Sequence, residues 1–185
     1  MIFCHVLICF TKMVFMDSDR INVNLNSEIG KLQHVVIHTP GFELEKITPE
    51  NAHTYLFSDI LNMQIAQNEH KYFKKVLQKV AKVHEVVDLL TDILKSDNIK
   101  SELVDKICEV ENIATIASYL KSLPAEKLSR QLIEGVSLKD ISNENSTEFA
   151  LKPVPNLFFM RDASFAMFDN ILISNMATQV RAREC

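Results

Sequence analysis

Chemical function is indicated most clearly in the segment 155–162, where an arginine and an aspartate directly follow two phenylalanines and a methionine. Consecutive residues of an extended chain point to opposite sides, so the segment predicts Asp162 inside a pocket and Arg161 outside it. A buried carboxylate needs a cation or several hydrogen-bond donors, and a guanidinium ligand supplies a planar fork of donors. The segment therefore predicts either a guanidinium-binding site or a structural Arg–Asp pair at a strand end.

The cysteines and histidines form no second motif of this kind. The four cysteines include no C-x-x-C pair and lie at positions 4, 9, 108 and 185. The six histidines are scattered over different predicted elements, whereas a zinc site needs ligands at short spacing. We therefore expect free thiols, as is typical of a reducing compartment, with no metal site and no cofactor.

These residues must be positioned by strands and helices, the first of which is a predicted strand at 32–37 that the Thr-Pro-Gly turn at 39–41 ends. A second β-branched run at 83–87 predicts another buried strand. Two strands joined through a helix are expected to pair in parallel. Residues 32–87 therefore form a predicted strand–helix–strand unit.

The helix of this unit is expected to be long. Thr48 is a suitable N-cap, Pro49 is suited to the first helical position, and the helical pattern ends near Val80. The spacing i, i+3, i+4, i+7 predicts that one stripe packs in the core, namely Phe73, Val76, Leu77 and Val80. The opposite, solvated side is expected to carry Lys74, Lys75 and Lys79.

Strand signals disappear after this unit. Short amphipathic patterns over 89–94, 103–110, 113–120 and 124–132 predict four helices. Gly135 is well placed to end the last of them in the left-handed conformation. We interpret this stretch as a small helical insertion.

Composition narrows the class of protein. The 185 residues are 47% apolar and 24% charged, which is typical of one globular domain with a core. The net charge of −4 leaves no excess of cations for a phosphate backbone, so nucleic acid is not an expected partner. Only three glycines are present, which favours a chain rich in helix.

The apolar stretch at 2–16 is interrupted only by His5, Thr11 and Lys12. No cation precedes it, no small-residue cleavage pattern follows it, and it is shorter than the about 20 residues that span a bilayer. Three interpretations stay open: an extension outside the fold, an extra strand or helix packed on the body, and a membrane or targeting signal. We favour the first, which predicts a cytoplasmic protein without a membrane partner.

Several blocks of the sequence, in order and at matching spacing over 27–184, resemble the arginine deiminase family. The first blocks are SEIGKL at 27–32, HTPG at 38–41, ITP at 47–49, LFSD at 56–59 and QNEH at 67–70. The segment PNLFFMRD at 155–162 is similar to the family motif PN-x-x-F-x-RD, and RARE at 181–184 is similar to its R-x-R-E segment.

The resemblance implies hydrolysis of L-arginine to L-citrulline and ammonia, with a cysteine attacking the guanidinium carbon and no cofactor. It implies that Asp162 is a catalytic carboxylate that holds the guanidinium, and that Phe159 packs on the substrate chain. By the same resemblance, Asn156 and Arg181 bind the α-carboxylate, and Leu56 lies at the α-amino end. A homo-oligomer of the complete enzyme is left open.

The resemblance also implies that the family's nucleophilic cysteine, catalytic histidine and further carboxylates lie downstream of the segment present here. Cys185 lacks the glycine- and histidine-containing approach of the reactive cysteine. We therefore expect an N-terminal fragment that is inactive alone, in which Arg161 serves the architecture of the site. Two alternatives are a non-enzymatic helical interaction or regulatory fragment descended from the family, and a related guanidino-group hydrolase or amidinotransferase.

The fold class implied is α/β, namely part of a five-bladed α/β propeller with a small all-helical insertion. The expected divisions are an apolar extension at 1–20, a first propeller unit at 21–90, the helical insertion at 91–145 and a truncated start of the next blade at 146–185.

Overall fold

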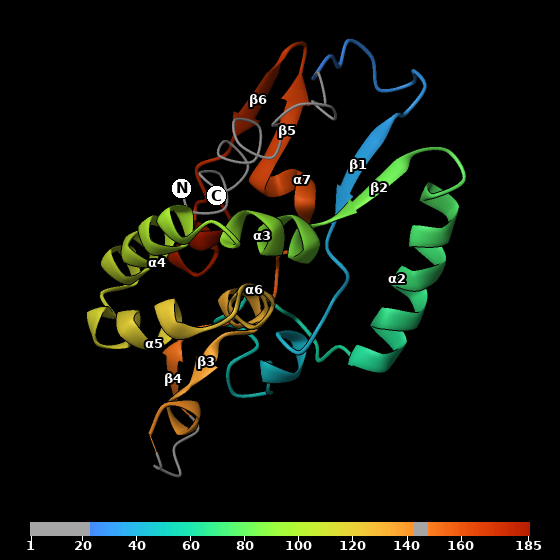
Figure 1. The fold of residues 1–185 in the computed structure, drawn as a ribbon. Helices are drawn as coiled ribbons and strands as arrows, with labels where there is room; N and C mark the ends of the chain where they lie inside the picture. Colours follow the sequence, from blue (N-terminus) through green and yellow to red (C-terminus); the bar gives the residue numbers. More distant parts are fainter. Residues whose placement is uncertain (1–22, 143–147) are drawn as a thin grey trace.

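The computed structural model describes residues 23–142 and 148–185, so the predicted extension at 1–20 lies outside the described residues. The described chain is a mixture of helices and short strands (Figure 1). Helices α3 to α6 gather on one side of the molecule, and α2 runs along the opposite side. None of the helices in the described ranges is long and apolar enough to cross a membrane.

The predicted parallel strand pair is confirmed. Strand β1 (His34–Ile37) pairs in parallel with β2 (Lys82–Glu85), with His34 opposite Lys82 and Ile37 opposite Glu85. The second strand is shorter than the predicted run at 83–87, because Val86 already belongs to helix α3 (Val86–Leu94). In this helix its side chain is buried in the helical core.

Two histidines lie side by side on this strand pair. The Nδ1 atom of His34 is 3.0 Å from Nε2 of His84, and the two rings are stacked with their centroids 5.3 Å apart. A hydrogen bond between two ring nitrogens needs one donor and one acceptor, so at least one ring must be neutral. Burial lowers the pKa of His84, and the charges of His34 and Lys82 lower it further.

The predicted start of the long helix is wrong. Helix α2 (Met63–Leu77) begins only after Asn62, whose side chain accepts a hydrogen bond from the backbone N–H of Ile65. The chain from Thr48 forms turns instead, because the Asn51 side chain accepts from the backbone N–H of Thr48 and donates to the carbonyl of Lys46. These local bonds compete with a helix.

The predicted core stripe of α2 is wrong as well. Phe73, Val76 and Val80, which follows α2, are each more than half exposed. Leu77 is half-buried, and α2 buries no residue. The helix instead packs through its polar face, where Lys74, predicted to be solvated, forms an ion pair with Glu85. Helical periodicity identifies an apolar face but does not identify which face a neighbouring element covers.

The four helices predicted between 89 and 132 are confirmed, and they form a cluster around an apolar core that Leu151, Val154 and Leu157 share. The cluster contains α3, α4 (Asp97–Glu111), the 3-10 turn η2 (Ala114–Ile116), α5 (Ala117–Ser122) and α6 (Ala125–Glu134). Its most deeply buried side chains are Leu90, Leu94, Val104, Leu120, Leu128, Leu132 and Ile133.

Gly135 ends α6 with a φ of 82° and a ψ of 172°, so φ is positive as predicted but ψ lies outside the left-handed helical region. This turn leads into β3 (Val136–Ser137) and the 3-10 turn η3 (Leu138–Asp140), and β3 pairs antiparallel with β4 (Phe149–Leu151).

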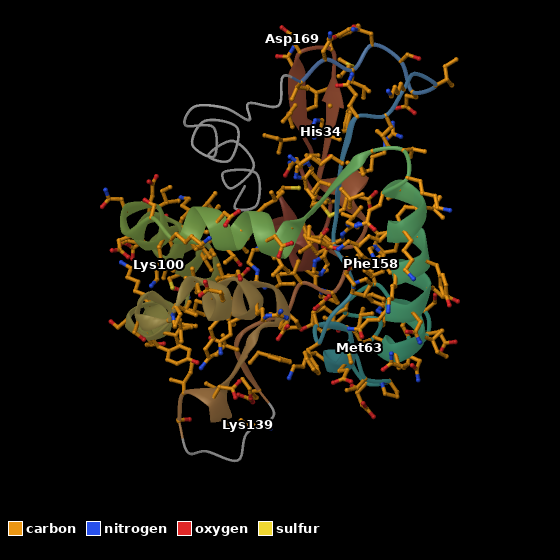
Figure 2. The ribbon with its side chains drawn as sticks, turned by 45° about the vertical axis from the view of Figure 1, so that its right-hand side comes forward. His34, Met63, Lys100, Lys139, Phe158 and Asp169 are labelled. Atoms are coloured by element: carbon orange, nitrogen blue, oxygen red, sulfur yellow. The ribbon has the colours of Figure 1, made fainter. Side chains whose placement is uncertain are left out.

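The C-terminal part carries the segment of chemical interest. One helical turn, α7 (Met160–Ala163), precedes the antiparallel hairpin of β5 (Ser164–Met167) and β6 (Asn170–Ile173), and Asp169 lies at the hairpin tip (Figure 2). The 3-10 helices η1 (Leu44–Lys46) and η4 (Gln179–Glu184) complete the described elements. The sheets of the described residues are two-stranded and none of them is closed.

Gly135 provides a test of the turn after α6. A Cβ atom at this position would lie 2.8 Å from the carbonyl oxygen of Leu151 and 2.8 Å from the backbone nitrogen of Pro153. Gly135→Ala is therefore expected to lower the free energy of unfolding by about 2 kcal/mol or more, measured by urea denaturation. The matched control is Gly30→Ala, whose Cβ would meet no atom closer than 3.8 Å. Equal effects of the two changes would contradict the assigned turn.

The His34–His84 contact predicts a pH dependence of stability. Because the folded state lowers the pKa of His84 below its ordinary value of 6.5, the unfolded chain binds more protons as pH falls through this value. Stability is therefore expected to decrease from about pH 7.5 to about pH 5.5. His84→Gln should weaken this dependence, whereas exposed His53→Gln should leave it unchanged. Identical pH profiles for all three proteins in thermal unfolding would refute the assignment.

Candidate functional site

The segment 155–162 does not reach the site as an extended chain. The backbone N–H of Phe159 donates to the carbonyl of Asn156 at 3.0 Å, and that of Asp162 donates to Phe159 at 3.2 Å, which forms the turn of α7. The prediction that Asp162 lies inside a pocket is therefore wrong, whereas Arg161 lies outside a pocket as predicted. Both residues are exposed, and Arg161 forms an ion pair with Glu28 at the surface. The architectural role of Arg161 stays a prediction.

Asn156 connects this segment to the loop that carries Leu56. The Asn156 side chain is 4% exposed and donates from Nδ2 to the carbonyl oxygen of Tyr55 at 2.9 Å. Leu56 follows directly, with a positive φ of 65° and a half-exposed side chain. A leucine in this conformation is strained, and the contact beneath it holds the strained turn in place.

Arg181 joins the remaining predicted residues. Its Nη1 atom donates to Oδ2 of Asp162 at 2.8 Å, and its guanidinium carbon lies 5.8 Å from the centre of the Phe159 ring. The structure therefore brings together Phe159, Asp162 and Arg181, on the α7 turn and on η4. Asn156 and Leu56 belong to a second contact, between the segment before α7 and the loop at Leu56. The neighbouring Phe158 lies in the central part of the molecule (Figure 2).

Glu184 is a residue of this cluster to which the sequence analysis assigned no role. Arg181 donates to it from Nε at 2.9 and 3.0 Å and from Nη2 at 2.6 Å. Its carboxylate is 1% exposed, whereas that of Asp162 is 51% exposed. The signal was the i, i+3 spacing of Arg181 and Glu184, which brings the two side chains together only in a helical turn.

The charges of this cluster affect one another. The hydrogen bonds to Glu184 and Asp162 raise the pKa of the Arg181 guanidinium. Burial raises the pKa of the Glu184 carboxyl, and Arg181 offsets part of this effect. Arg183, the residue between Ala182 and Glu184 in the chain, is buried near Glu111, and burial lowers its pKa to about 10.

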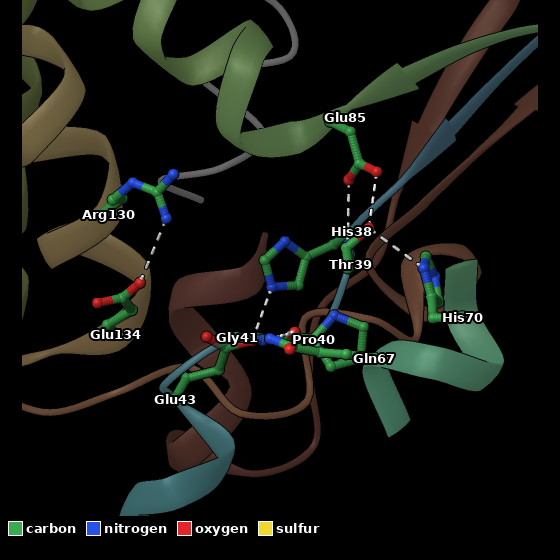
Figure 3. A network of polar contacts seen from close by, with 10 residues as sticks. All are labelled: His38, Thr39, Pro40, Gly41, Glu43, Gln67, His70, Glu85, Arg130 and Glu134. Atoms are coloured by element: carbon green, nitrogen blue, oxygen red, sulfur yellow. Dashed lines mark hydrogen bonds and ion pairs between the residues drawn. The ribbon is translucent and has the colours of Figure 1, made fainter. Parts of the chain in front are cut away.

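A second polar network connects β1, β2 and α2 (Figure 3). Glu85 accepts from the backbone and the hydroxyl of Thr39 at 3.0 and 2.7 Å and from Lys74 at 2.7 Å. His70 contacts the same hydroxyl at 3.2 Å. Burial alone would raise the pKa of Glu85, but the hydrogen bonds from Lys74 and Thr39 lower it below its ordinary value.

Next to this network, His38 forms a buried pair with Glu43 at 2.9 Å, and Glu43 also accepts from the backbone N–H of Gly41 at 2.7 Å. Burial and the nearby charge of Glu43 raise the pKa of Glu134. Within the described ranges, no group of three or more histidine, cysteine or acidic side chains is arranged to hold a metal ion.

Two cysteines belong to the described residues, and both are buried. Burial raises the pKa of the Cys108 thiol, which disfavours the nucleophilic thiolate. Cys185 lies near α7, where its thiol donates to the carbonyl of Ala163 at 3.5 Å. The predicted thiols at 4 and 9 lie outside the described residues.

Comparison with known proteins identifies the family. A family model described as arginine deiminase matches residues 53–185, which include all five predicted site residues. The chain belongs to the arginine deiminase family. Curated relatives named arginine deiminase include those of Limosilactobacillus reuteri, which is 35% identical, and Pediococcus pentosaceus, which is 31% identical. Each alignment covers 88% of this chain and 44% of the arginine deiminase it matches, so the chain spans less than half the length of these relatives.

Leu56 offers a test of strain at the site. Because glycine tolerates positive φ, Leu56→Gly is expected to raise the free energy of unfolding by up to about 1 kcal/mol. The matched control is Leu61→Gly, since Leu61 is similarly exposed but has no positive φ, and this change should lower stability by about 1 kcal/mol. Chemical denaturation measures both, and equal losses would contradict strain at Leu56.

Proposed function

We propose that this chain is the N-terminal part of an arginine deiminase, which hydrolyses L-arginine to L-citrulline and ammonia. The observation that carries the proposal is the contact of Asp162 with Arg181 beside the exposed ring of Phe159. A carboxylate, a guanidinium and an aromatic face in one place suit a ligand that has a cationic end, an anionic end and an aliphatic chain between them.

In this proposal the carboxylate of Asp162 holds the substrate guanidinium, and Arg181 binds its α-carboxylate. Phe159 packs on the aliphatic chain, while Asn156 and Leu56 shape the amino acid end. Asn156 already donates one amide hydrogen to the protein, so it acts with the other hydrogen or by positioning the loop at Leu56.

The chemical step requires groups that the family supplies outside the segment matched here. A thiolate attacks the guanidinium carbon, ammonia leaves with a proton, and water then releases citrulline and restores the thiol. Of the described cysteines, Cys108 lies in the helical core and Cys185 does not follow the family's approach to the nucleophile. We therefore propose that the 185-residue chain binds its ligand weakly and does not turn it over.

We also propose that the family's five-bladed propeller describes the complete protein, with 21–90 as its first unit, 91–145 as the helical insertion and 146–185 as the start of the next blade. The parallel pair β1–β2 and the hairpin β5–β6 support this proposal. The four cysteines include no C-x-x-C pair, which fits a reducing compartment, so the cytoplasm is the proposed location.

The test joins residues 21–184 to the matching C-terminal part of a family member. Asp162→Asn is expected to lower kcat/KM for L-arginine at least about tenfold, because a neutral amide loses the charge-assisted hydrogen bonds to the guanidinium. The matched control is Asp169→Asn at the hairpin tip, which should leave citrulline release unchanged. Equal activity of the Asp162 variant and the parent would refute the role of Asp162. Citrulline release by the 185-residue chain alone would refute the proposal that this chain is inactive by itself.

A further inference from the structure

The two charged residues proposed for opposite ends of the substrate are paired with each other in this structure. Arg181 donates one hydrogen bond from Nη1 to Asp162 at 2.8 Å. A substrate guanidinium and a substrate carboxylate therefore each meet a group whose charge is already matched. Binding of either end alone must compete with this internal partner.

Arg181 is held unequally by its two carboxylates. Glu184 accepts its three other hydrogen bonds and is buried, whereas Asp162 accepts a single bond and is half exposed. Water screens an exposed pair and can replace its single bond, whereas a buried pair loses far more when it is broken. The contact with Asp162 is therefore the one that opens, and Glu184 keeps Arg181 charged and in place when it does.

We propose that the Asp162–Arg181 pair is an exchangeable clasp that selects ligands carrying both a guanidinium and a carboxylate, with Glu184 as the positioning residue for Arg181. This inference rests on the proposed function of the site. The substrate guanidinium replaces Arg181 on Asp162, and the substrate carboxylate replaces Asp162 on Arg181. Each protein charge exchanges one partner for another, and no charge is left unmatched.

A ligand with only one of the two charges completes half of this exchange. Agmatine, which lacks the carboxylate, takes Asp162 from Arg181 without offering Arg181 a new anion. L-Norvaline, which lacks the guanidinium, takes Arg181 from Asp162 without offering Asp162 a new cation. The clasp thus favours L-arginine over both fragments by more than their separate contacts, because each fragment must break the internal pair on its own.

The test is an NMR titration of the 185-residue chain with L-arginine, agmatine and L-norvaline, which detects weak binding. Asp162→Asn opens the clasp and leaves Arg181 anchored by Glu184. This change is expected to raise the affinity for L-norvaline about two- to fivefold, as expected for loss of an exposed competing pair, and to weaken binding of agmatine. Asp169→Asn, which removes the same charge at the hairpin tip, should change neither affinity.

The reciprocal variant removes the cation of the pair, the Arg181 guanidinium. Because Arg181→Gln alone would leave Glu184 buried without a partner, it is combined with Glu184→Gln, so that two amides replace the ion pair. This double variant should bind agmatine more tightly and L-arginine more weakly than the parent. If the parent binds L-arginine but neither variant gains affinity for its fragment, the clasp is wrong and the proposed site stands. If the parent shows no binding of L-arginine, the proposed site and the clasp both fail.

Discussion

The carboxylate of Glu85 is the contact on which the strand–helix–strand unit depends. It lies at the end of β2 and accepts hydrogen bonds from Thr39, just after β1, and from Lys74 of α2. Because α2 buries no residue, these polar contacts attach it to the strand pair, whereas the helices of the helical cluster pack through apolar side chains. A partly buried carboxylate is costly without hydrogen-bond donors, and the three donors offset this cost.

The helical cluster and the parallel strand pair could be predicted from the sequence, because in both the apolar pattern coincides with the buried face. Helix α2 could not, since its apolar stripe at Phe73 and Val76 faces outward while its polar face is attached to Glu85. Its start was missed for a related reason. Hydrogen bonds from the Asn51 side chain stabilise turns where propensity favours a helix.

Of the candidate site, too, one part could be predicted from the sequence and another part could not. The resemblance selected five residues, and the structure places Phe159, Asp162 and Arg181 of these in one cluster. The burial of Asp162 was inferred from an extended chain that is in fact a helical turn. Glu184 was missed because three-residue spacing brings two side chains together only in a helical turn, and 179–184 gave no helical pattern. A short 3-10 helix of this kind depends on tertiary contacts rather than on local propensity.

The helical cluster also has a part in forming the site. The hydrogen bond between Asn156 and Tyr55 joins residues 101 positions apart. The chain between them must therefore fold so that its two ends lie next to each other. Val154 and Leu157, on either side of Asn156, are buried in the same apolar core as α3 to α6. The core therefore fixes the backbone around Asn156, and Asn156 in turn supports the strained turn at Leu56. The helical cluster, which carries none of the proposed ligand contacts, thus helps to position the segment at Asn156 and the loop at Leu56.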